Sequence, residues 1–311
     1  MLDYEKFKLT QEDIDSGIQD FFTQLLIEAK KQKINAKKLE DLSSQTPTVS
    51  YLIGQPGSGK TSLGKHVLRQ YVANSECAVE VGSDKIATYH RDYSELIKLL
   101  PDDCYTISRQ FVRPAEPIIY GELRKKKINI LQEASFDKGE RDYSRIEEFK
   151  KAGYNIQINI MAVDKYESFL SCIERDIKLL ELGYDPRPVA RMNHDRMYTP
   201  FLQELMEMEK RGLLDEVNVY ARGKTFNIPS LVYTTGSNSY SNVHEAILYE
   251  RMKSRKNLLN KPQQYLSRLH EAKNMIELMV QDEMLKKNYI DELEDLEREF
   301  INELSFDRNI H

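Results

Sequence analysis

The sequence predicts an α/β fold in which a doubly wound, mostly parallel sheet has helices on both faces and is followed by a C-terminal helical extension. Strand-like and helix-like segments alternate from about residue 48 onward, and a glycine-rich loop lies between the first strand and the next helix. Such alternation favours a parallel sheet covered on both faces. After Gly236 the chain contains no glycine and a single proline, Pro262, which indicates helices.

The predicted elements begin with a helix over residues 10–30. Thr10 can cap this helix, and apolar residues from Ile18 to Leu26 recur at helical spacing. Strands are expected near residues 48–53, 78–82, 128–133, 155–163 and 217–220, with helices between them. Residues 225–239 are expected to form a short hairpin or a loop that ends the sheet.

The last part of the chain, residues 241–311, is expected to be a helical hairpin or a small bundle. Apolar residues three or four positions apart, such as Leu293, Leu296 and Phe300, indicate amphipathic helices. We expect this extension to pack on the core, with self-association and binding of another protein as alternatives. The sequence therefore predicts a domain over residues 1–240 and an extension over residues 241–311.

The composition limits the classes of function. The 311 residues carry a net charge of -5, with 31% charged residues, which disfavours non-specific attraction to nucleic acid or to anionic lipid. The three cysteines are widely spaced, so neither a disulfide framework nor a zinc site is indicated. The N-terminus lacks the pattern of a signal peptide, and no apolar run reaches the ~18 residues of a membrane span. A cytoplasmic location is expected.

Residues 54–61, "GQPGSGKT", match the eight positions of a Walker A motif and lie between a predicted strand and a predicted helix. Glycines let backbone N–H groups converge on phosphate oxygens, and the helix adds its positive N-terminus. Lys60 is expected to bridge the β and γ phosphates of ATP, and Thr61 to bind the Mg²⁺ that accompanies the nucleotide. The expected nucleotide-binding residues are Gly54, Gln55, Pro56, Gly57, Ser58, Gly59, Lys60, Thr61 and Ser62.

Acidic residues follow two further predicted strands, at the sheet edge where doubly wound folds bind ligands. Asp84 lies 24 residues after Lys60 and can accept a proton from an acceptor hydroxyl, or can cap the next helix or turn. Glu133 and Ser135 end the third strand and lie on the same side of it. Glu133 can orient the acceptor or the magnesium shell, or can be an ordinary strand-end carboxylate.

Four arginines lie within or after the helical segment that contains "FLSCIERDIKLLELG", namely Arg175, Arg187, Arg191 and Arg196. The planar guanidinium group is suited to phosphate oxygens. Any of the four can equally be a solvated surface residue, and composition does not select among them.

Five segments occur in the order and near the spacing of a known family: "GQPGSGKTSL", "SDKIATYHRDYSEL", "QEAS", "MAVDKYESFLSCIERD" and "LLDEVNVYARG". Over about residues 10–222 the chain resembles the zeta toxins, P-loop kinases of bacterial toxin–antitoxin systems that phosphorylate UDP-N-acetylglucosamine. The resemblance implies a P-loop kinase-type version of the doubly wound fold. It also implies a small helical antitoxin partner, whose helix blocks the ATP pocket.

The resemblance also implies roles for individual residues. Asp84 would be the catalytic base at the 3′-hydroxyl of the sugar, and Glu133 and Ser135 would contact the nucleotide-sugar substrate. Arg175 and Arg187 would surround the ATP phosphates as catalytic groups together with Lys60. Glu116 lies one position from a substrate-side acid of the family, and His90 is expected to shape the loop after Asp84.

The chain departs from the family pattern at residues 82–87, 133–135 and 186–189. These departures leave open a kinase of the same fold that phosphorylates another nucleotide sugar or the ribose of a dinucleotide. A third hypothesis is an ATP-binding P-loop switch whose helical tail binds a partner.

Overall fold

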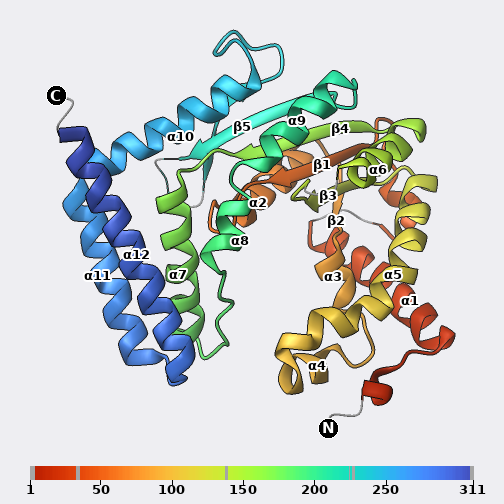
Figure 1. The fold of residues 1–311 in the computed structure, drawn as a ribbon. Helices are drawn as coiled ribbons and strands as arrows, with labels where there is room; N and C mark the ends of the chain where they lie inside the picture. Colours follow the sequence, from red (N-terminus) through yellow and green to blue (C-terminus); the bar gives the residue numbers. More distant parts are fainter. Residues whose placement is uncertain (1–3, 33–35, 137–138, 224, 226–227, 309–311) are drawn as a thin grey trace.

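The computed structural model describes residues 4–32, 36–136, 139–223, 225 and 228–308. In these residues the strands form a six-stranded sheet in the order β2-β3-β1-β4-β5-β6 (Figure 1). The strands are β1 (Thr48–Ile53), β2 (Ala78–Glu80), β3 (Asn129–Glu133), β4 (Asn155–Met161), β5 (Glu216–Arg222) and β6 (Pro229–Thr234). The first five are parallel, and β6 pairs antiparallel with β5. The mostly parallel α/β fold is confirmed, and the segment expected to be a hairpin or loop supplies β6.

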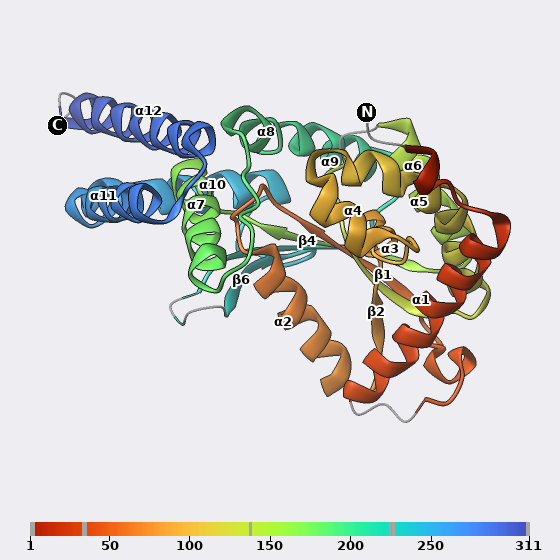
Figure 2. The ribbon, with the colours of Figure 1, turned by 90° about the horizontal axis from the view of Figure 1, so that it is seen from below.

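Helices lie on both faces of the sheet, since α2 packs on one face and most other helices on the opposite one (Figures 1 and 2). The long helices are α1 (Gln11–Lys31), α2 (Lys60–Ala73), α5 (Pro101–Lys125), α6 (Glu140–Lys151), α7 (Lys165–Glu181), α9 (Pro200–Lys210), α10 (Val243–Asn260), α11 (Pro262–Met279) and α12 (Glu283–Arg308). The shorter elements are η1 (Tyr4–Phe7), η2 (Leu39–Leu42), α3 (Ser83–Ala87), α4 (Tyr93–Leu99) and α8 (Arg191–Arg196). None of the described helices combines the length and the apolar composition of a membrane-spanning segment.

The two faces follow from the alternation of side chains along the strands. On β1, Leu52 contacts the core of α2, which includes Leu63 and Val67. Its neighbours Tyr51 and Ile53 point to the other face, in the core built with α1, α5, α6 and α9. Because every strand of a parallel sheet ends its run at the same edge, the loops after β1, β3 and β4 meet there.

The predicted N-terminal helix is present as α1. Thr10 caps it by a reciprocal pair of hydrogen bonds, in which its backbone N–H donates to Asp13 Oδ2 at 2.8 Å and its Oγ1 accepts from the Asp13 N–H at 3.2 Å. Phe21 and Leu25 are fully buried in the central core. The apolar stripe of α1 therefore covers part of the sheet.

The C-terminal helices pack on the rest of the chain, as the sequence analysis expected. The first turn of α10 places Val243, Ala246 and Ile247 in the central core. Helices α11 and α12 form an antiparallel hairpin that lies beyond α7, away from the sheet (Figures 1 and 2). The hairpin shares a second apolar core with α7, made of the following buried residues: Tyr166, Phe169, Leu170, Ile173, Ile177, Tyr265, Leu269, Ala272, Ile276, Val280, Tyr289, Leu293, Leu296 and Phe300.

The second core makes a prediction about stability. Leu269 in α11 is 0% exposed, so Leu269→Ala should lower the free energy of unfolding by about 2–5 kcal/mol. The matched control is Leu278→Ala in the same helix, where the side chain is 74% exposed and the change should stay within about 0.5 kcal/mol. Denaturant unfolding measures both. Equal losses for the two variants would contradict the packing of α11 against α7.

Candidate functional site

The glycine-rich loop runs from Gly54, at the carboxyl end of β1, to Lys60, the first residue of α2. Two of its glycines are required by the backbone. Gly57 has φ +71°, and a Cβ atom there would lie 1.9 Å from the carbonyl oxygen of Ser168 in α7. Gly59 caps α2 with φ +104°, a left-handed conformation that other residues rarely adopt. The loop is therefore in direct backbone contact with α7, and its glycines permit the close approach.

The Lys60 side chain folds back over the loop. Its Nζ donates to the carbonyl oxygens of Gly54 at 2.7 Å and of Gln55 at 3.2 Å. Burial lowers the pKa of Lys60, and the nearby carboxylate of Glu133 opposes this shift. The ammonium group thus lies at the mouth of the phosphate loop, in a position to exchange carbonyl contacts for phosphate oxygens.

The loop lines one cavity of about 1090 Å³. Most of the sequence-predicted site residues line the same cavity: Gly54, Pro56, Gly57, Ser58, Gly59, Lys60, Thr61, Ser62, Asp84, Glu133, Ser135 and Arg175. Asp84 reaches it from α3, Glu133 from the end of β3, and Arg175 from α7. The sheet edge therefore brings together groups that lie far apart in the sequence.

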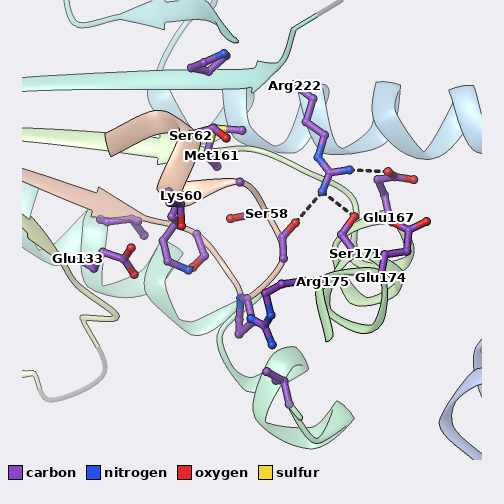
Figure 3. A pocket seen from close by; sticks show the side chains of 18 of the residues that line it. Ser58, Lys60, Ser62, Glu133, Met161, Glu167, Ser171, Glu174, Arg175 and Arg222 are labelled. Atoms are coloured by element: carbon purple, nitrogen blue, oxygen red, sulfur yellow. Dashed lines mark hydrogen bonds and ion pairs between the residues drawn. The ribbon is translucent and has the colours of Figure 1, made fainter. Parts of the chain in front are cut away.

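The cavity has two distinguishable ends (Figure 3). Lys60 and Glu133 lie at one end, and Asp84 and Ser135 line the same cavity. Glu167, Ser171, Glu174 and Arg222 lie on the other side of the glycine-rich loop, and Arg268 from α11 lines the cavity as well. The cavity is slightly larger than the range of about 300–1,000 Å³ found for ordinary ligand pockets.

Among the residues to which the sequence analysis assigned a binding or catalytic role, three are absent from the described lining of the cavity, namely Gln55, Glu116 and Arg187; the other candidate arginines, Arg191 and Arg196, are absent from it as well. The Glu116 carboxylate lies behind α3, where it accepts from Ser83 Oγ at 3.0 Å and pairs with Arg145 at 3.1 Å. Arg187 is exposed, and its carbonyl oxygen accepts from Arg175 Nη2 at 2.5 Å. The third residue, Gln55, has a buried side chain that points away from the cavity.

Gln55 ties the glycine-rich loop to α7. Its Nε2 donates to the carbonyl oxygen of Val163 at 2.8 Å and to Ser168 Oγ at 3.0 Å. Ser168 Oγ lies 2.9 Å from His194 Nε2, and His194 Nδ1 lies 2.8 Å from Asp195 Oδ1. The Ser168 hydroxyl also donates to the carbonyl oxygen of Asp164 at 2.9 Å, and His194 contacts Ser168 through one ring nitrogen and Asp195 through the other. These contacts connect the glycine-rich loop through α7 to α8.

His90 has the loop-shaping position that the sequence analysis expected. Its ring is buried, and its Nδ1 accepts from the backbone N–H of Asp92 at 3.1 Å. Burial lowers the pKa of His90. The bond closes the turn between α3, which carries Asp84, and α4.

Arg222, at the end of β5, contacts the glycine-rich loop and was assigned no role by the sequence analysis. Its Nη2 donates to the Gly57 carbonyl oxygen at 2.6 Å and to Ser171 Oγ at 3.0 Å (Figure 3). Its Nη1 pairs with Glu167. The sequence did contain one indication of a role for Arg222, because it follows the carboxyl end of a predicted strand, as Asp84 and Glu133 do.

The fold and the loop define a class of protein. A parallel strand, a glycine-rich loop with left-handed glycines, and a helix beginning with a lysine are the parts of a P-loop protein with a kinase-like α/β fold. The chain belongs to the Zeta toxin family, whose model matches residues 31–232. The resemblance drawn from the sequence motifs is confirmed, and the C-terminal extension, residues 241–311, lies wholly outside the matched range.

Individual relatives agree with this family. Toxin zeta of Streptococcus agalactiae is 26% identical over 208 residues, which are 67% of this chain and 71% of the relative. Toxin PezT of Streptococcus pneumoniae serotype 4 is 21% identical over 225 residues, which are 72% of this chain and 86% of the relative. A solved structure from the PezAT chromosomal toxin–antitoxin system of Streptococcus pneumoniae aligns with a TM-score of 0.66 and 18% identity. That alignment covers 87% of this chain and 100% of the other, and it shows a shared fold.

The buried His194 makes a prediction about pH. Burial lowers the pKa of His194 below the ordinary 6.5, and the hydrogen bond to Asp195 opposes this shift. The unfolded chain therefore binds this proton first on acidification, so the free energy of unfolding should decrease as the pH falls from 6.5 to the lowered pKa. Denaturant unfolding at neutral pH and at successively lower pH values measures the decrease.

In His194→Gln the decrease should be shallower, because one of the titrating groups is gone. It should not vanish, since His90 contributes in the same direction. His270→Gln, which removes an exposed imidazole from α11, is the control and should keep the wild-type slope. A His194→Gln slope equal to that of the wild type would refute the assignment.

Proposed function

We propose that this protein is an ATP-dependent kinase that transfers the γ-phosphoryl group to the 3′-hydroxyl of UDP-N-acetylglucosamine, and that it acts as the toxin of a toxin–antitoxin system. The observation that carries the proposal is that Asp84 and Lys60, which are far apart in the sequence, line one cavity. Membership in the Zeta toxin family supports the reaction class. The acceptor is inferred from the family resemblance.

ATP fits the residues of the glycine-rich loop. Gly57 and Gly59 adopt left-handed conformations directly before α2, whose N-terminus would stabilise an anion. Lys60 adds a positive charge beside them. These groups would hold the triphosphate, and the nucleoside would extend toward the end of the cavity lined by Arg222.

Mg²⁺ would be held by the Thr61 hydroxyl together with phosphate oxygens, and would supply charge neutralisation of the triphosphate when bound. Thr61 is exposed to the cavity, in the second position of α2. The described residues contain no cluster of three or more His, Cys, Asp or Glu side chains suited to a metal. The Thr61 hydroxyl and the phosphate oxygens together would suit an Mg²⁺ ion that arrives bound to the nucleotide.

The chemistry assigned to the chain is positioning and charge stabilisation. The bond between the β,γ-bridging oxygen and the γ-phosphorus breaks, a bond from the sugar oxygen forms, and ADP leaves. Lys60 and Arg175 would offset the charge on the transferring group. The Asp84 carboxylate would accept the proton of the attacking hydroxyl late in the transfer, for which an ordinary ionised carboxylate suffices.

The acceptor end of the cavity supports a polar, hydroxyl-bearing substrate. Asp84, Glu133 and Ser135 line the cavity with two carboxylates and one hydroxyl, which would suit hydrogen bonds to sugar hydroxyl and amide groups. Residues 82–87 depart from the family pattern at this end, so another nucleotide sugar or a dinucleotide ribose is the second candidate acceptor. Arg187, placed outside the cavity lining, would have to turn inward to contact the phosphates.

A small antitoxin is the proposed protein partner. The structure that shares the fold of this chain belongs to a toxin–antitoxin system. A helix laid across the cavity mouth would exclude the nucleotide, which is the mode of inhibition that the family resemblance implies.

The reaction is tested by incubating the protein with ATP, Mg²⁺ and a panel of metabolites, followed by mass spectrometry. UDP-N-acetylglucosamine should gain about 80 Da, the mass of one phosphoryl group. Asp84→Asn should lower the rate by about a hundredfold or more while ATP binding remains, because only the base is lost. Lys65→Ala, on an exposed part of α2, is the control and should keep the wild-type rate.

The alternatives predict other results in the same assay. A gain only on another nucleotide sugar or on a dinucleotide would keep the kinase and replace the acceptor. ATP hydrolysis without any phosphorylated acceptor, unaffected by Asp84→Asn, would refute the kinase assignment and favour a nucleotide switch.

The toxin assignment is tested in growing bacteria. Expression of the wild-type chain should slow growth, and Lys60→Ala should restore it, because the lysine that holds the triphosphate is lost. Lys65→Ala, in the same helix, should still slow growth. Equal inhibition by the wild type and by Lys60→Ala would show that growth inhibition does not depend on nucleotide binding.

A further inference from the structure

The C-terminal hairpin of α11 and α12 reaches the cavity, although it lies outside the range matched by the family. Arg268 of α11 lines the cavity together with the α7 residues Glu167 and Glu174. Its Nε and Nη2 donate to the two carboxylate oxygens of Glu174 at 2.8 and 2.9 Å. Its Nη1 donates to Glu167 Oε2 at 2.8 Å. One arginine thus holds two carboxylates of α7 in place.

The contacts of Arg268 continue to the glycine-rich loop. The other oxygen of Glu167 pairs with Arg222, whose Nη2 donates to the Gly57 carbonyl oxygen at 2.6 Å (Figure 3). A continuous series therefore runs from α11 through Glu167 and Arg222 to the backbone that would hold the phosphates. The Glu167 side chain is only 13% exposed, and the Glu174 pair is bidentate. These are the conditions under which ion pairs contribute more than isolated surface pairs.

A second contact, independent of the first, joins α12 to the site. Tyr289 OH donates to Asp176 Oδ2 at 2.8 Å. The other oxygen, Oδ1, accepts from Arg175 Nε at 2.9 Å and Nη2 at 2.8 Å. The Asp176 side chain is 1% exposed, so its direction depends on these partners. The tyrosine of the hairpin therefore helps to aim the guanidinium group of Arg175.

We propose that the C-terminal hairpin contributes to nucleotide binding through two positioning residues. Arg268 positions Arg222, and Tyr289 positions Arg175. The inference rests on the proposed binding of ATP. A long arginine side chain loses conformational freedom when it binds a ligand, and affinity rises when that freedom is already lost in the free protein. The hairpin holds both arginines before the nucleotide arrives.

The test measures the dissociation constant for ATP with Mg²⁺ by calorimetry, on full-length variants. Arg268→Gln should weaken ATP binding by about five- to tenfold, and Tyr289→Phe, which removes one hydroxyl, by about threefold. The difference between the wild type and Arg268→Gln should shrink as salt is added, because ions screen the partly exposed pairs. Arg268→Lys keeps the charge but not the bidentate pair. Its dissociation constant for ATP should lie between those of the wild type and Arg268→Gln.

The matched control is Lys273→Gln, in the same helix as Arg268. Lys273 Nζ pairs with Glu297 of α12 at 2.7 Å, and Lys273 is not among the described residues that line the cavity. This variant should lose a similar amount of thermal stability while ATP affinity stays at the wild-type value. A loss of affinity in Arg268→Gln and Tyr289→Phe but not in Lys273→Gln supports a positioning role.

Two results would overturn the inference while the proposed function stands. One is wild-type affinity for ATP in both Arg268→Gln and Tyr289→Phe. The other is an equal loss of affinity in Lys273→Gln, which would mean that general stability of the hairpin is all that matters. A wild-type protein that binds no ATP would overturn the proposed function, and this inference with it.

Discussion

The close contact between the glycine-rich loop and α7 is the constraint on which the site depends. The backbone at Gly57 lies so near the Ser168 carbonyl oxygen that no side chain can be placed between them. Polar groups hold this contact from both sides: Gln55 donates to Ser168, and Arg222 donates to the Gly57 carbonyl oxygen. Gln55 is buried, and because a buried polar group needs its partners, its bond to Ser168 favours one position of the loop over others. The wall of the cavity and the loop are thereby set in a fixed relation before any ligand binds.

Helix α7 has one polar side that lines the cavity and one apolar side that packs against α11 and α12. Glu167, Ser171, Glu174 and Arg175 recur at helical spacing along the side that faces the cavity. The intervening residues, such as Phe169, Leu170 and Ile173, are buried, and they belong to the core shared with α11 and α12. An apolar stripe on the back of α7 would otherwise be exposed to water, at a cost of about 25 cal/mol for each Å². The hairpin covers that stripe and so supports the orientation of the polar face.

Local signals in the sequence predicted much of the fold and part of the site. Lys60 and the glycines around it were recognisable because strand, loop and helix are consecutive in the chain. Asp84 and Glu133 were expected at the sheet edge, and Arg175 was expected near the ATP phosphates from the family resemblance; all three line the cavity. Arg222 and Arg268 were not assigned, and Glu116 was placed with the substrate although it lies behind α3. Their positions depend on contacts between segments 29 to 165 residues apart, which periodicity does not reveal.

The connected side chains of Ser168, His194 and Asp195 have the residue types of a hydrolase catalytic triad. Here both the serine and the histidine are 0% exposed, and the serine oxygen also accepts from Gln55. A nucleophile must reach a carbonyl carbon, and this oxygen cannot leave its surroundings to do so. A search for hydrolases by the geometry of three side chains would select this protein wrongly. A search by side-chain geometry alone does not consider whether solvent reaches the serine. Solvent access distinguishes a reactive hydroxyl from one that only makes structural hydrogen bonds.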